Sequence, residues 1–172
     1  MEKSKFVKYH VPCPECDSSD AASINVIMNT NVKQQHDNIS DKHGGIFAPL
    51  TDRNISQETA TKFGVKTVYD SNGVIAQHLY PYYNQGELSG VKIRLIRDKI
   101  FRFEGTMQGC SLFGQNLFKH GGKYLTITEG ECDAMAAYEL MGSKWAVVSI
   151  RNGAQSAVKD IKENIEYIES FD

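Results

Sequence analysis

Short apolar runs alternate with polar, glycine-containing segments through the middle of the chain. Residues 65–69 and 74–80 are rich in β-branched and aromatic side chains, and an Asn72-Gly73 pair lies between them. An Asn-Gly pair flanked by two such runs predicts a β-hairpin. Another pair of strands is expected after a second turn, so the pattern predicts an antiparallel meander over residues 65–104.

Two connecting segments surround this meander. Ser56 can cap a short helix over residues 57–63, and Gly64 is placed to end it. After the meander, residues 105–120 form a glycine-containing connector, whose Leu112-Phe113-Gly114 we expect to dock apolar side chains into the core.

The last third of the chain has a different pattern. The apolar runs at residues 124–127 and 145–150 are continuous, which is typical of buried strands. A helix is expected after each run, over residues 134–140 and 154–167, and Gly142 is a plausible C-cap of the first. The apolar residues spaced along one face of the second helix are Val158, Ile161, Ile165 and Ile168. This order predicts a parallel β-α-β-α unit.

Three acids gather where the first of these strands meets its helix. Glu129, Glu131 and Asp133 lie at the carboxyl end of the predicted strand. Ligands bind at that position in open α/β sheets, and carboxylates there can hold Mg²⁺ or act in acid–base chemistry. Alternatively, the acids only favour the positive N-terminus of the helix. The spacing by itself leaves both interpretations open.

Composition sets the broad class. The chain has 172 residues, 41% of them hydrophobic and 23% charged, which is typical of one globular domain or slightly more. Its net charge of −2 does not by itself indicate nucleic-acid binding, so any such surface must be local. We find no apolar run near 18 residues and no signal peptide, and the four cysteines fit a reducing cytoplasm.

One segment departs from this charge balance. Residues 92–102 hold one acid and five bases, which are Lys92, Arg94, Arg97, Lys99 and Arg102. Alternation predicts that Lys92 and Arg94 share one strand face while Ile93 and Leu95 share the other. We therefore expect the apolar side to pack on a core and the basic side to face outward as a stripe. The stripe is either a solvated sheet face or a phosphate-binding surface, and its local excess of positive charge favours the second.

Cys13 and Cys16 form a C-x-x-C near the start of the chain. Two thiolates at this spacing are half of a tetrahedral zinc site, and no second pair follows nearby. The nearest imidazoles, on His10, His36 and His43, do not have the spacing typical of zinc ligands. A complete site and a degenerate zinc knuckle both remain open, and the missing ligands favour the second. The polar residues 25–45 then predict a linker and a domain boundary.

Several motifs resemble one known family. They are Leu112-Phe113-Gly114, Gly121-Gly122-Lys123, residues 128–135 and residues 148–154. Together they resemble the primase half of the bifunctional DNA primase-helicases of short-tailed bacteriophages, to which mitochondrial Twinkle-type helicases are related. The resemblance covers nearly the whole chain, with residues 9–16 similar to the start of the family's zinc-binding domain.

The resemblance implies an α+β fold in three parts. Residues 1–45 would be a degenerate zinc-ribbon-like segment and linker. Residues 46–120 would be the N-terminal subdomain of the primase RNA polymerase domain, with the basic meander. Residues 121–172 would be a partial Toprim domain, an incomplete parallel β-α-β-α unit that opens with the Glu129 motif.

The implied function is template-directed RNA primer synthesis on single-stranded DNA during phage DNA replication. Glu129 falls on the Toprim glutamate that serves Mg²⁺-dependent nucleotidyl transfer, with Glu131 and Asp133 as weaker metal candidates. Lys92 and Lys99 fall on catalytic positions. The residues implied to contact nucleotide phosphates and the primer-template are Lys92, Arg94, Arg97, Lys99 and Arg102. Cys13 and Cys16 would hold zinc in an incomplete site.

The chain also departs from the family pattern. The second cysteine pair is replaced by a polar stretch, and the family's second acidic motif and helicase would lie beyond Asp172. We therefore expect a fragment that is inactive alone and works in the host cytoplasm, away from membranes. Its expected partners are single-stranded DNA, ribonucleoside triphosphates and a separately encoded remainder. The alternative is a non-catalytic module for single-stranded DNA binding or partner assembly.

Overall fold

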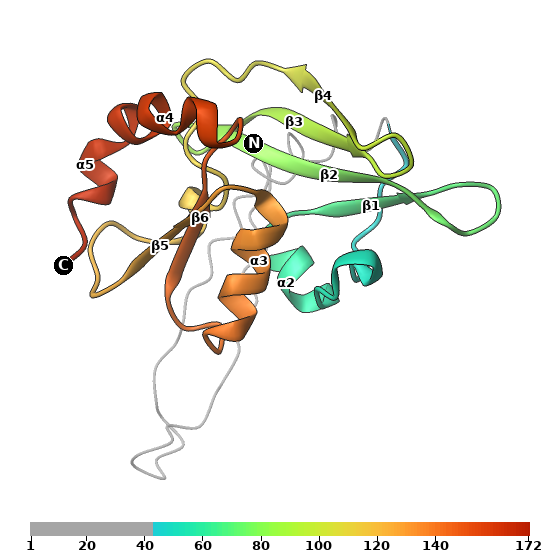
Figure 1. The fold of residues 1–172 in the computed structure, drawn as a ribbon, viewed down its shortest axis with the longest axis horizontal. Coiled ribbons are helices and arrows are strands. Elements are labelled where there is room, and N and C mark those ends of the chain that lie inside the picture. Colours follow the sequence, from blue (N-terminus) through green and yellow to red (C-terminus); the bar gives the residue numbers. More distant parts are fainter. Residues whose placement is uncertain (1–42) are drawn as a thin grey trace, which may run out of the picture. The chain divides into compact units, whose positions relative to one another are not determined.

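Residues 43–172 are described by a computed structural model, within a unit that spans Gln35–Asp172 (Figure 1). The elements of the antiparallel half are the 3₁₀ helix η1 (Thr51–Arg53), α2 (Gln57–Lys62), β1 (Lys66–Tyr69), β2 (Ile75–Asn84), β3 (Glu87–Leu95) and β4 (Ile100–Gly105). The later elements are η2 (Gln115–Leu117), β5 (Leu125–Thr128), α3 (Glu131–Leu140), β6 (Ala146–Ser149), η3 (Ala154–Ser156), α4 (Ala157–Glu163) and α5 (Ile165–Ile168). The predicted zinc knuckle lies outside the described residues, and so does the linker up to residue 42.

The predicted meander is confirmed as a four-stranded antiparallel sheet in the order β1-β2-β3-β4. The turn that joins β1 to β2 is held by Asp70, whose carboxylate accepts hydrogen bonds from the backbone N–H groups of Asn72 and Val74 at 2.8 and 2.9 Å. Ahead of the sheet, Ser56 caps α2 as predicted, accepting a hydrogen bond from the Thr59 N–H.

The strand predicted over residues 74–80 extends further than the sequence pattern indicated. Strand β2 continues through Pro81 to Asn84 before the chain reverses at Gln85-Gly86. In the described part of the chain, β1 pairs with β2 only as far as Leu79, so Pro81 has no strand beside it on that edge. A residue without an N–H group is tolerated at such a position.

The two predicted parallel strands are also confirmed. Strands β5 and β6 pair in parallel, from Leu125 opposite Ala146 to Thr128 opposite Ser149, and α3 packs against both. The helix ends at Leu140, Met141 is its C-cap, and Gly142 follows with φ 68°, as expected just after a helix C-terminus.

The expectation that both strands are buried is correct only for β6. All four β6 residues are buried, whereas Ile127 in β5 is 36% exposed. Within the described range, β6 has β5 on one side and Phe113 bridged to Ser149 on the other, while β5 pairs only with β6.

One apolar cluster joins the sheet to the parallel strands. Its buried members include Leu50, Phe63, Tyr80, Tyr82, Phe113, Met135, Tyr138 and Val147. Phe113 contacts three other rings, with centroid separations of 5.5 Å to Phe63, 5.9 Å to Tyr80 and 6.0 Å to Tyr82. The docking role expected for the Leu112-Phe113-Gly114 segment is thus confirmed.

The last helical segment differs from the prediction. It is divided into η3, α4 and α5, and Val158 on the expected apolar face is 67% exposed. The residue that α4 buries is Asp160, which pairs with the buried Arg151. A buried guanidinium needs a carboxylate partner, so this pair sets the rotation of α4 in place of the apolar stripe. No helix of the described region is long and apolar enough to cross a bilayer.

Candidate functional site

The register of β2, β3 and β4 defines two faces of the sheet. Lys92 lies opposite Tyr80 and Phe103, and Arg94 lies opposite His78 and Phe101. Directly opposed residues of antiparallel strands project to the same face. We call this the inner face, because its Tyr80 belongs to the cluster shared with the parallel strands.

The predicted basic stripe is divided between the two faces. Arg102 pairs with Ile93, so it projects to the outer face, where Ile93 packs with Leu79 and Val91 in a separate apolar cluster. Lys92 does not face outward as expected, since only 12% of its side chain is exposed. Both faces of this sheet carry packed apolar residues, and alternation alone cannot tell which of them meets the rest of the fold.

Lys92 reaches across to the carboxyl ends of the parallel strands. Its Nζ donates one hydrogen bond to Glu131 Oε1 at 2.7 Å and another to the backbone oxygen of Arg151 at 2.7 Å. Glu131 opens α3 just after β5, and Arg151 follows β6. A lysine ammonium has three protons, so one of them is left without a hydrogen-bond acceptor among the described residues.

Glu131 is only 4% exposed, and its carboxylate accepts hydrogen bonds from two side chains, Lys92 and Tyr82. The Tyr82 hydroxyl donates to the same Oε1 atom at 2.6 Å. Burial raises the pKa of Tyr82 well above its ordinary value, and the adjacent Glu131 carboxylate adds to this rise. Tyr82 therefore remains a neutral donor, and Glu131 is engaged with protein groups.

The other two acids have different surroundings. Glu129 is exposed at the end of β5, and its Oε1 accepts one long hydrogen bond, 3.4 Å from the Ala154 N–H. Asp133 is exposed in the first turn of α3. The sequence grouped three acids, and the structure leaves two of them accessible.

The described residues include no group of three or more His, Cys, Asp or Glu side chains that could hold a metal ion. Mg²⁺ commonly takes only one or two carboxylates and completes its shell with water and substrate phosphates. Glu129 fits such a role, because its carboxylate is exposed at the carboxyl end of a parallel strand.

Sequence reasoning missed Arg151, which is 4% exposed behind the site. Its Nε and Nη2 donate to Asp160 Oδ1 at 2.9 and 2.6 Å, and its Nη1 donates to the Cys110 carbonyl at 2.9 Å. A further contact joins Nη2 to Glu163. This network fixes the backbone carbonyl that accepts from Lys92. The hydrogen-bond partners of Arg151 are 9 to 41 positions away in sequence, so no local spacing of residues predicts this network.

A second network of polar side chains, which the sequence also did not predict, lies on the inner face. His78 Nε2 lies 3.1 Å from Asp52 Oδ1, and His78 Nδ1 lies 3.2 Å from the Tyr80 hydroxyl. The Tyr80 hydroxyl in turn lies 3.2 Å from Cys132 Sγ, next to Glu131. Burial lowers the pKa of His78, although Asp52 opposes this effect.

In the described region, none of the remaining predicted bases forms an ion pair with Glu131. Arg97 and Lys99 are exposed in the turn between β3 and β4, where Lys99 has φ 54°. Arg94 is half-buried on the inner face, and its Nε has no hydrogen-bond partner in the described region. The structure thus places Lys92 at the carboxyl ends of β5 and β6, Arg94 beside it, and Arg102 on the opposite face.

Comparisons with known proteins define the class. No protein-family model matches the chain. The chain is 30% identical, over a 200-residue alignment, to the DNA helicase/primase of Enterobacteria phage T3, covering 99% of this chain and 35% of that protein. The primase fragment of the bacteriophage T7 primase-helicase has a TM-score of 0.68 and 30% identity, covering 97% of this chain and 77% of that one.

A second solved structure agrees. It contains the bacteriophage T7 lagging-strand DNA polymerase interacting with primase domains of two gp4 subunits bound to an RNA/DNA hybrid and dTTP. The match has a TM-score of 0.67 and 34% identity, over 77% of this chain and 66% of that chain. The chain therefore belongs to the phage primase-helicase family, and it corresponds to the primase region, as the sequence motifs predicted. It spans about a third of the length of the curated T3 relative.

Proposed function

We propose that this chain serves template-directed RNA primer synthesis on single-stranded DNA in phage DNA replication. One observation carries the proposal: on a chain similar to the T7 primase fragment, the Lys92 ammonium lies against the carboxyl ends of two parallel strands. Cations and exposed carboxylates at such an edge suit a nucleoside triphosphate with its Mg²⁺.

Each inner-face residue has a role in this proposal. The third proton of the Lys92 ammonium, with the accessible part of the half-buried Arg94 guanidinium, would donate to phosphate oxygens. Arg97 and Lys99 would add positive charge at the turn. Lys99 would also be a catalytic residue, as the family resemblance implies. Glu131 would orient Lys92 through the 2.7 Å ion pair and would not itself bind metal.

Glu129 would hold Mg²⁺, and Asp133 is a second exposed carboxylate nearby in sequence. A bound Mg²⁺ would neutralise charge on the triphosphate. In this proposal the parallel strands open a Toprim-type domain, and Cys13 and Cys16 belong to a zinc-ribbon-like segment. The cytoplasm of the host cell is the proposed location.

The proposed partners follow from the same relatives. The T7 structure holds primase domains bound to an RNA/DNA hybrid and dTTP. We infer that this chain takes single-stranded DNA and ribonucleoside triphosphates, and that it assembles with other primase-helicase subunits.

Glu129→Gln tests the metal role. We expect Mg²⁺-dependent binding of a fluorescent ribonucleoside triphosphate to fall at least tenfold, because one charged ligand is lost. Binding of single-stranded DNA should persist. Glu166→Gln is the matched control, since Glu166 is also exposed but lies in α5.

Dinucleotide synthesis on a single-stranded template is the second readout. Undiminished Mg²⁺-dependent triphosphate binding by Glu129→Gln would contradict the metal role. A wild-type chain that binds single-stranded DNA but shows no Mg²⁺-dependent triphosphate binding would instead support the non-catalytic module. Primer synthesis by the chain alone at the level of a complete primase would refute the expectation that it needs a partner.

A further inference from the structure

Phe101 is an exposed aromatic residue on the inner face of the edge strand β4. Half of its surface is accessible, at 49% exposure. The Lys92 Nζ lies 4.8 Å from its ring centroid and the Arg94 Cζ lies 5.7 Å away. Phe103, two positions along the strand, packs against Tyr82 with a centroid separation of 6.1 Å and fixes this part of β4.

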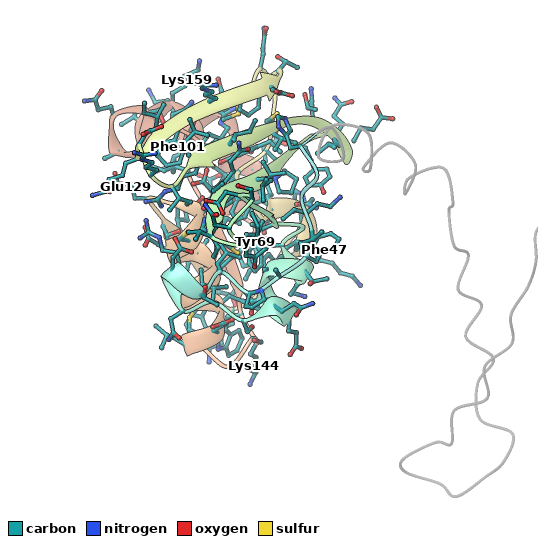
Figure 2. All side chains as sticks on the ribbon, turned by 90° about the vertical axis from the view of Figure 1, so that its right-hand side faces the viewer. Phe47, Tyr69, Phe101, Glu129, Lys144 and Lys159 are labelled. Atoms are coloured by element: carbon teal, nitrogen blue, oxygen red, sulfur yellow. The ribbon has the colours of Figure 1, made fainter. Side chains whose placement is uncertain are left out.

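Among the residues that the structure describes, no other exposed aromatic ring has two cations placed over it. Phe47 is 42% exposed, and the one cation placed over its ring is Lys66, 5.3 Å away. The ring of Tyr124 meets Trp145 edge-on at 5.0 Å. In the view of Figure 2, Phe101 lies toward the left with Glu129, while Phe47 lies toward the right.

Through Lys92, Phe101 is also connected to the candidate site. The ammonium that lies over the ring is the one that donates to Glu131 at 2.7 Å. A ring attached to a rigid strand and flanked by cations is suited to stacking a nucleobase, while the cations contact the adjoining phosphates.

The charges extend beyond what one nucleotide needs. Lys92 and Arg94 lie over the Phe101 ring, and the exposed Arg97 and Lys99 lie in the turn just before Phe101 in sequence. Several cations along β3 and the turn that follows it match a strand with several phosphates better than a single triphosphate.

We propose that Phe101 is a stacking platform for one base of a single-stranded nucleic acid that crosses the inner face at β4. The proposal deepens the proposed function, since it assigns a base contact to the strand-binding surface. The phosphates next to that base would contact Lys92 and Arg94, and phosphates further along the strand would contact Arg97 and Lys99 in the β3–β4 turn.

The test compares two strands of equal length, an oligothymidylate and an abasic oligodeoxynucleotide. Both carry the same phosphates, and only the first can stack. We expect wild-type protein to prefer the oligothymidylate, and Phe101→Ala to lose about tenfold in affinity for it while its affinity for the abasic strand is unchanged. Phe101→Trp should keep the preference, and its fluorescence should be quenched on binding in a Trp145→Phe background.

Phe47→Ala is the matched control, because it also removes an exposed ring that lies under a lysine. Equal oligothymidylate affinity for Phe101→Ala and wild type, with Phe101→Trp fluorescence unchanged on binding, would overturn the stacking role. A Phe101→Ala variant weakened only toward a ribonucleoside triphosphate would overturn the assignment to a strand. Failure of the proposed function is distinguishable, because it would appear as absent Mg²⁺-dependent triphosphate binding by wild-type protein, whichever strand that protein prefers.

Discussion

Glu129 and Glu131 are two positions apart, yet their side chains have opposite surroundings. Glu131 is 4% exposed and accepts hydrogen bonds from Tyr82 and Lys92, while Glu129 is exposed at the strand end. Removing one partner of a buried ion pair leaves the other charge uncompensated, whereas an exposed carboxylate contributes little to stability.

Glu131→Gln should therefore lower the free energy of unfolding by about 2 to 3 kcal/mol, because Lys92 loses its counter-charge while Tyr82 keeps an acceptor. Glu129→Gln should change it by less than about 0.5 kcal/mol. Urea denaturation of the two variants measures both values. Equal destabilisation by the two substitutions would mean that Glu131 does not hold Lys92.

The sequence could identify these acids as a group but could not separate their roles. All three follow one strand, and spacing places each near the start of a helix. The separation depends on Lys92 and Tyr82, which are 39 and 49 positions from Glu131 in sequence. Only the docking of the sheet against α3 brings them together.

Strand β2 is linked to η1 and α3 through His78. Its ring is fully buried between Asp52 and the Tyr80 hydroxyl. Burial lowers the pKa of His78 below its ordinary value of 6.5, so the folded protein takes up a proton less readily than the unfolded chain. The resulting stability is present above the unfolded pKa and is lost as the pH falls through the folded pKa.

We predict that the free energy of unfolding declines between about pH 7 and pH 5, and that His78→Gln makes this decline shallower. The glutamine has no proton to gain in that range. Urea midpoints measured at several pH values in one buffer system check the slope. A His78→Gln variant that declines as steeply as wild type would show that other groups cause the pH dependence.

Individual elements could be predicted where local chemistry decides them. The Asn72-Gly73 pair and the Ser56 cap act within a few residues, and both were identified from the sequence. The buried face of the last helical segment was predicted only in part, because the orientation of α4 follows from Arg151 and Asp160. The position of Arg151 in this pair depends on where β6 ends, and the spacing of apolar residues along the helix gives no information about that.

The antiparallel sheet and the parallel strands share one core. Phe113, from the connector between them, contacts Tyr80 and Tyr82 of β2 and the Phe63 ring that follows α2, and its backbone bridges Ser149 of β6. The inner face was not predictable, since alternation in β3 shows which residues share a face but not which face meets the rest of the fold.

Because of this shared core, the described region should unfold in one cooperative transition. Trp145 is the one tryptophan of the chain and lies just before β6, so its fluorescence reports on the parallel strands. Phe113→Leu should lower the free energy of unfolding by about 1 to 2 kcal/mol. In urea denaturation, the midpoint from Trp145 fluorescence and the midpoint from far-ultraviolet circular dichroism should fall by the same amount. Two separate midpoints would show that the halves fold independently.

The central claim is that nucleic acid binds the inner face, where Lys92 and Arg94 lie beside the carboxyl ends of β5 and β6. Arg94 and Arg102 are both on the two final strands of the sheet, but they project to opposite faces. Their glutamine variants remove one charge each and therefore compare the two faces directly.

The measurement is the salt dependence of single-stranded DNA binding by Arg94→Gln, Arg102→Gln and wild type, with circular dichroism confirming that each variant is folded. Each lost phosphate contact reduces the slope of log K against log salt by about 0.7 for a single strand. We predict this reduction for Arg94→Gln and a wild-type slope for Arg102→Gln. A reduced slope for Arg102→Gln with an unchanged slope for Arg94→Gln would contradict the account.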